Sequence, residues 1–164
     1  THDHYDHLSM DDIEKIMGEK TVVVVPASAG EAIKGNLKKV SPGDTLTIEG
    51  VEIQAVPAYN IGKEFHPRDK NYVGYVFKIG GVSYYHAGDT DYIPEMRGIH
   101  VDVAFLPVGG TYTMNVEEAA KAAEDIKPKV AVPMHWGSII GSEKDAEKFK
   151  SLCSCEVQIM EKEM

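Results

Sequence analysis

The chain has few cysteines and no long apolar segment, and each shortage excludes a class of protein. Only two of its 164 residues are cysteine, Cys153 and Cys155, and neighbours on one strand rarely pair, so we expect no disulfide framework. The apolar run 22–25 is far too short to cross a bilayer, and no basic-then-apolar leader is recognisable. We therefore expect a cytoplasmic protein without a membrane span.

Positive charge is also scarce. Seventeen Lys and Arg residues against 26 Asp and Glu residues give a formal net charge of −9 at pH 7. A surface this acidic repels phosphate backbones, so we do not expect a nucleic-acid partner. Apolar residues at 43% and charged residues at 26% are typical of globular proteins, and neither a linker nor a repeat divides the chain. We predict a single domain over residues 1–164.

Hairpin patterns dominate the first half of the chain, and strands alternate with helices in the last third. A helix is expected to begin at Ser9 or Asp11 and to end near Met17, with Ile13, Ile16 and Met17 on its apolar face. The other expected elements are a strand at 21–25, a short helix at 31–34, hairpins at 45–48/51–56 and 72–79/82–85, strands at 101–106, 130–132 and 156–160, and helices at 116–126 and 143–152. This order predicts an α+β fold with mixed sheets covered by helices.

Seven histidines are the uneven part of the composition, and three lie in the first seven residues. His2, His4, Asp6 and His7 form an H-x-H-x-D-H pattern of imidazoles and a carboxylate, which are preferred ligands of zinc and similar ions. Residues two apart in an extended segment point the same way, so His2 and His4 can bind one ion, while Asp6 and His7 can reach a second. The alternative is a purification tag, but tags are usually uniform histidine runs.

Two further candidate ligands follow expected strands. Asp89 lies in H-A-G-D-T-D, where Gly88 permits a sharp turn and the carboxylate can bridge two ions. The alternative role for Asp89 is to cap a helix near residues 92–96, but with the first motif present we assign that cap to Thr90 or Asp91. His135 lies in V-P-M-H-W-G, after the strand at 130–132, and occupies the same strand-end position.

One more imidazole is needed for the first ion, and His66, His86 and His100 are the candidates. We favour His66, because loops present ligands freely and His66 lies in a polar loop. His86 then becomes a residue that donates a hydrogen bond to a ligating carboxylate. We assign no role to His100.

These motifs resemble the metallo-β-lactamase superfamily. The segments Y-x-H-A-G-D-T-D, L-P-V-G-G-T-Y-T-M (residues 106–114), E-E-A-A-K-A-A and V-P-M-H-W-G are similar to its ascorbate-phosphate lactonase-like and phospholipase D-like hydrolases. The resemblance implies a four-layer αββα sandwich with a dinuclear site at one edge. If the ligand positions of the family are carried over to this sequence, His2, His4 and His66 hold the first metal and Asp6, His7 and His135 hold the second. Asp89 then bridges the two metals.

Family members place the first motif after several N-terminal strands. Here the motif begins at residue 2, so we expect those strands to be missing from this chain. Their absence would leave a sheet edge uncovered. Oligomeric state depends on this point, and a homo-oligomer in which chains exchange a strand is one outcome.

The resemblance implies a hydrolase for a small lactone, ester or phosphodiester, with two divalent ions as cofactors, preferably zinc, with manganese or iron as alternatives. A hydroxide bridging the metals would be the nucleophile, oriented by Asp6. Tyr112 or His86 would protonate the leaving group. Lys63 and Arg68, which flank His66, would bind a phosphate or carboxylate of the substrate, unless they form a solvated basic loop.

Two alternative functions remain. The first is a metal-binding fragment or degenerate member without catalysis, which would lack an open coordination position. The second is a nuclease related to ribonuclease Z, against which the net charge of −9 argues.

Overall fold

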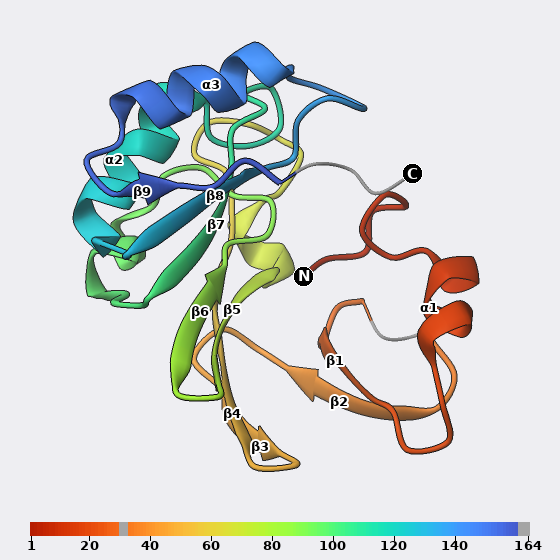
Figure 1. Ribbon diagram of the computed structural model, residues 1–164. Helices are drawn as coiled ribbons and strands as arrows, with labels where there is room; N and C mark the ends of the chain where they lie inside the picture. Colours follow the sequence, from red (N-terminus) through yellow and green to blue (C-terminus); the bar gives the residue numbers. More distant parts are fainter. Residues whose placement is uncertain (30–32, 161–164) are drawn as a thin grey trace.

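The computed structural model describes residues 1–29 and 33–160. The larger of its two sheets has seven strands in the order β3-β4-β5-β6-β7-β8-β9 (Figure 1). Neighbouring strands from β3 to β6 are antiparallel, and those from β6 to β9 are parallel. The strands are β3 (Thr45–Ile48), β4 (Val51–Pro57), β5 (Val73–Ile79), β6 (Val82–His86), β7 (Val103–Pro107), β8 (Val130–Met134) and β9 (Glu156–Val157).

Helices α2 (Val116–Ile126) and α3 (Glu143–Leu152) cover one face of this sheet (Figure 1). They bury an apolar cluster that includes Tyr85, Leu106 and Phe149, each fully enclosed. The 3-10 turn η2 (Pro94–Gly98) packs beside α2, and a second such turn, η1 (Arg68–Lys70), lies between β4 and β5. This cluster forms the main core of the domain.

A second, two-stranded sheet consists of the parallel strands β1 (Val22–Pro26) and β2 (Asn36–Val40). Helix α1 (Met10–Ile16) lies on its outer side, where Met10 and Ile13 pack against Val25. Its inner side packs against the large sheet, where Val40 meets Ala55.

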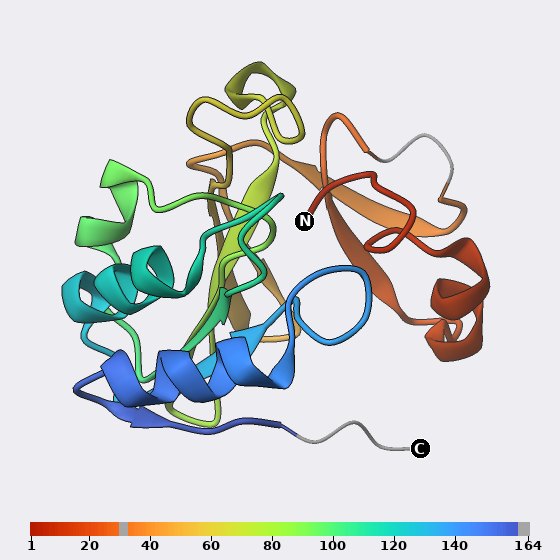
Figure 2. The ribbon, with the colours of Figure 1, turned by 90° about the horizontal axis from the view of Figure 1, so that it is seen from above.

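The four layers are therefore α1, β1–β2, β3–β9 and α2–α3 (Figure 2). This arrangement is the αββα sandwich expected from the motifs. None of the helices in the described part of the chain is long and apolar enough to cross a membrane.

Three expectations about local structure were wrong. The strand β2 was missed, because its charged, exposed residues show little of the apolar pattern that predicts a strand. It forms by pairing with β1, and this pairing is a tertiary contact that the residues of β2 do not indicate. Ile16 is 80% exposed rather than buried. The turn η2 begins after Ile93 with no side-chain cap, so Thr90 and Asp91 do not cap it. The helix expected at 31–34 lies partly outside the described residues.

Candidate metal centre

The seven residues predicted as metal ligands come together from four parts of the chain. Four lie in the N-terminal segment, one lies in the loop between β4 and β5, and two follow β6 and β8: His2, His4, Asp6, His7, His66, Asp89 and His135. The strands β6, β7 and β8 are parallel neighbours, so their carboxyl ends lie at one edge of the sheet. This edge is where Asp89 and His135 meet.

Backbone hydrogen bonds hold the N-terminal segment against this edge. The amide of Val73 in β5 donates to the carbonyl of Thr1 at 3.1 Å. The carbonyl of His4 accepts from the amides of His7 and Leu8, both at 2.9 Å, which closes a turn. The turn directs the first two histidines of the motif and its last two residues toward different groups of ligands.

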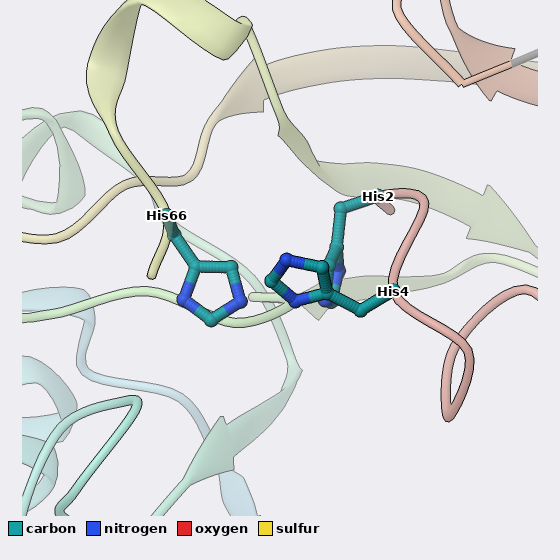
Figure 3. A group of neighbouring side chains, drawn as sticks. All are labelled: His2, His4 and His66. Atoms are coloured by element: carbon teal, nitrogen blue, oxygen red, sulfur yellow. The ribbon is translucent and has the colours of Figure 1, made fainter. Parts of the chain in front are cut away.

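The first group consists of His2, His4 and His66, whose side chains converge in Figure 3. Each offers a ring nitrogen, and the chosen nitrogens lie within 4.8 Å of one another. His2 and His66 are almost completely buried. The structure thus brings His66, and not His86, to His2 and His4.

The second group consists of Asp6, His7 and His135. The Oδ2 atom of Asp6 lies 3.6 Å from Nε2 of His7 and 4.0 Å from Nε2 of His135. The rings of His7 and His135 are stacked with their centroids 5.5 Å apart. This group is more exposed to solvent than the first.

The carboxylate of Asp89 touches both groups. Its Oδ2 atom lies 3.4 Å from Nε2 of His66, 3.8 Å from Nε2 of His2 and 3.1 Å from Nε2 of His135. Its Oδ1 atom lies 3.3 Å from Nε2 of His7. A carboxylate placed between two ligand groups can contact both of two neighbouring cations.

Burial and hydrogen bonding set the charges at this centre. Burial lowers the pKa of His2 to about 2 and also lowers the pKa of His66, so both imidazoles are neutral at pH 7. Burial raises the pKa of Asp89, but hydrogen bonds from His135 and His7 outweigh it and hold that pKa well below its usual range. The hydrogen bond to Asp89 in turn raises the pKa of His135. At His2, His66 and Asp89, neutral imidazoles beside an ionised carboxylate are the protonation states that metal ligands need.

Unpaired nitrogens test whether a metal ion fits here. The buried Nε2 atoms of His2 and His66 have no hydrogen-bond partner among the described residues. An unsatisfied buried polar atom costs about 1–3 kcal/mol. A divalent cation among these groups would remove that cost, so the residues present fit a metal centre.

A hydrogen-bond network fixes the orientation of His66. Its Nδ1 atom lies 3.1 Å from Oδ1 of Asn60 and 3.2 Å from the carbonyl oxygen of Tyr112, which are both acceptors. The proton is therefore on Nδ1, and Nε2 is left with its lone pair toward the other ligands. Asn60 is itself held by Asp91, whose Oδ1 accepts from Nδ2 of Asn60 at 3.0 Å. Sequence reasoning missed Asn60 entirely and gave Asp91 only a capping role, although Asp91 stands in the motif around Asp89.

The two loop cations predicted to bind substrate, Lys63 and Arg68, have other partners. The ammonium of Lys63 donates to Asp91 at 2.6 Å and to the carbonyl of Thr113 at 2.8 Å. Arg68 pairs with Glu95 at 3.0 Å and lies outside the cavities that flank the ligands. Both charges have other partners in this structure, and binding of a substrate phosphate or carboxylate by Lys63 and Arg68 stays a prediction.

His86 and Tyr112, the two expected proton donors, each line a cavity beside the ligands. Burial lowers the pKa of His86 to about 4, and its Nδ1 atom accepts from the amide of Gly88 at 3.2 Å. The ring of Tyr112 packs edge-on against Phe65, with centroids 4.6 Å apart. His100 is exposed, away from both cavities.

Known proteins are similar to this chain in sequence and in fold. A family model described as beta-lactamase superfamily domain matches residues 1–135. A UPF0173 metal-dependent hydrolase of Pyrococcus abyssi is 36% identical over 169 residues, which covers 98% of this chain and 75% of that protein. A UPF0173 metal-dependent hydrolase of Methanopyrus kandleri is 37% identical over 163 residues, which covers 92% of this chain and 70% of that protein.

Solved structures agree with these matches. A crystal structure of a Parabacteroides distasonis protein superposes with a TM-score of 0.87 at 36% identity, covering 99% of this chain and 74% of that one. A metallo hydrolase from Ignicoccus hospitalis superposes with a TM-score of 0.80 at 26% identity, covering 98% of this chain and 74% of that one. The chain belongs to the metallo-β-lactamase superfamily and, within it, to the UPF0173 metal-dependent hydrolase family.

Proposed function

We propose that this chain hydrolyses a small lactone, ester or phosphodiester with the help of two divalent metal ions, preferably zinc. His2, His4 and His66 would hold one ion, Asp6, His7 and His135 would hold the other, and Asp89 would bridge them. The observation that carries the proposal is the position of the Asp89 carboxylate, within 4 Å of nitrogens from both groups. When bound, such ions lower the pKa of a water molecule and polarise the bond to be cleaved.

The side chains around this centre have separate tasks. The Asp6 carboxylate borders both flanking cavities, so it can accept a hydrogen bond from the attacking water and orient it. The Nδ1 atom of His86 accepts a hydrogen bond from the amide of Gly88, so the proton of the neutral ring is on Nε2. His86 lines one of the two cavities. Tyr112 lines the other cavity, and its phenol can donate a proton to a leaving group on that side. His86, neutral at pH 7 because burial lowers its pKa, can donate only a hydrogen bond from Nε2.

The first test is the metal content of the chain, purified without chelator or added metal and measured by elemental analysis. We expect about two equivalents of metal per chain, and hydrolysis that a chelator abolishes. The substitution Asp89→Ala should lose metal and activity together, whereas Asp69→Ala, an exposed carboxylate on η1, should keep both. Metal binding without hydrolysis of any ester, lactone or phosphodiester would instead support the non-catalytic alternative.

A second set of variants tests the choice of the third histidine. His66→Ala should empty the first group, whereas His86→Ala should weaken metal binding only partly. The exposed His100→Ala serves as the matched control and should bind metal like the parent chain. If His86→Ala empties the site and His66→Ala does not, the two assignments are reversed.

A further inference from the structure

Apolar side chains surround the entrance to the candidate metal centre. A cavity of about 430 Å³ opens beside His4 and His66, and its wall includes Phe65, Tyr112 and Ile139. Phe65 is 46% exposed and Ile139 is 49% exposed, although both are large and apolar. Exposed apolar side chains gathered around a polar centre are typical of a ligand-binding surface.

The charges in the same place are all negative. The cavity is lined by the carboxylates of Asp3, Asp6 and Asp89, and its described lining contains neither lysine nor arginine. The adjoining cavity of about 300 Å³, which shares Asp6, His135 and Ile139 with the first, has no lysine or arginine in its lining either. In the metal-loaded chain the ions would offset the charges of Asp6 and Asp89. Away from the ions, an anionic group on a substrate would be desolvated against Phe65 and Ile139 with no side-chain cation to compensate.

The nearest cations in the loop are already neutralised. Lys63 is tied to Asp91 and to backbone carbonyls, and Arg68 is paired with Glu95. Moving Lys63 into the cavity would leave the Asp91 carboxylate, which is almost completely buried, without its partner. Neither Lys63 nor Arg68 lines either cavity in the described structure.

Building on the proposed function, we propose that the substrate is a neutral ester or lactone whose apolar part lies against Phe65, Tyr112 and Ile139. The two cavities flank Asp6 and His135, so the acyl and alcohol parts of one ester can occupy one cavity each. In the reaction, the oxygen of water bonds to the acyl carbon and the bond from that carbon to the alcohol oxygen breaks. One proton of the water ends on the alcohol, and the carboxylic acid releases the other to solvent.

A matched pair of esters tests the proposal on the zinc-loaded chain. The 4-nitrophenyl ester of hexanoic acid and the mono-4-nitrophenyl ester of adipic acid share their leaving group and acyl length, and differ in a terminal carboxylate. We expect kcat/KM for the hexanoate to exceed that for the adipate by at least about tenfold, because the terminal carboxylate must be desolvated against the apolar wall with no lysine or arginine beside it. Equal rates, or a preference for the adipate, would overturn the proposal.

A matched pair of variants locates the apolar surface. Ile139→Ala should raise KM for the hexanoate about fivefold with little change in kcat, because it removes contact area used equally in ground and transition state. Ile79→Ala makes the same change at a residue that is 53% exposed at the end of β5, outside both cavities, and should leave KM unchanged. An equal change of KM in the two variants would contradict the proposed binding position of the substrate.

Binding separates this inference from the proposed function. The 4-nitroanilide of hexanoic acid and the mono-4-nitroanilide of adipic acid resist hydrolysis, and their affinities can be measured by calorimetry. The neutral anilide should bind the chain more tightly than the carboxylate one, and Ile139→Ala should weaken it. If no ester is hydrolysed but the neutral anilide binds as expected, the hydrolase assignment fails and the apolar pocket stands. If neither anilide binds, the pocket proposal fails.

Discussion

The two sheets differ greatly in how much apolar surface they bury. The large sheet and helices α2 and α3 enclose fully buried side chains such as Tyr85, Leu106 and Phe149. Around the small sheet and α1, the fully or nearly buried apolar residues that the structure describes are fewer and smaller, for example Val25. Because stabilisation scales with the apolar area removed from water, the large sheet provides most of the folding free energy.

The candidate metal centre lies across this division. Four of its residues precede the small sheet, and the other three, His66, Asp89 and His135, belong to loops of the large sheet. The better-packed part therefore presents ligands on a stable scaffold, while the N-terminal segment is tied to it by few bonds, such as the one from Val73 to Thr1. Metal binding would join the two parts and stabilise the N-terminal segment more than the large sheet.

The largest effect expected from this comparison is on stability. Leu106→Ala removes a fully buried side chain of the large sheet and should lower the free energy of unfolding by about 2–5 kcal/mol. Leu37→Ala makes the same change in the small sheet, where the leucine is half-buried, and should cost about 1–2 kcal/mol. Urea denaturation followed by circular dichroism measures both. Equal losses would show that the two sheets contribute alike.

The second expected effect concerns the ligands that the large sheet presents. A Cβ atom added at Gly109 would lie 2.6 Å from the carbonyl oxygen of His135, which is backbone and cannot move cheaply. Gly109→Ala should therefore displace His135. Zinc binding at the second group should weaken much more than about tenfold, because a displaced ligand no longer has the geometry that the ion needs. At Gly98 the added Cβ would meet nothing within 4 Å, so Gly98→Ala is the control.

Zinc content and competition with a chelator measure this prediction. The first group should keep its metal in Gly109→Ala, because His2, His4 and His66 do not contact Gly109 in the described structure. Unchanged binding of both equivalents would mean that the end of β8 tolerates displacement, contrary to the rigid scaffold inferred here for the large sheet.

The smallest expected effect tests the network that orients His66. Asn60→Ala removes an acceptor 3.1 Å from Nδ1 of His66 and should lower zinc affinity about 10–100-fold. Asn36→Ala, at an exposed position in β2, should leave the affinity as it is. Titration against a competing chelator measures both, and equal affinities in the two variants would show that Asn60 does not position the ligand.

Local chemistry made much of the fold predictable. Helices α2 and α3 lie at the predicted residues, because Asn115 and Ser142 form capping boxes that depend only on the following turn. Both hairpins formed as expected around Glu49-Gly50 and Gly80-Gly81, where positive φ angles favour such turns. The strand β2 could not be predicted in this way, because it depends on β1, a partner that its own residues do not indicate.

The candidate site divides in the same way. The spacing of His2, His4, Asp6 and His7 and the G-D-T segment indicate metal-ligand chemistry from the residues alone. Preferring His66 to His86 required a guess, and the fold brings His66 to the first group. The role expected for Lys63 depended on a partner that the sequence hides, since Asp91 lies far along the chain.

By itself, the sequence determined which residue types are available for metal binding, where helices and hairpins begin and end, and the family to which the chain belongs. These features depend on neighbours within a few positions. The tertiary structure alone decided that Asp89 contacts both ligand groups, that Lys63 is neutralised by Asp91, and that the cavities beside the ligands are apolar and acidic. Each of these follows from contacts between segments far apart in the chain, which exist only once the core has packed.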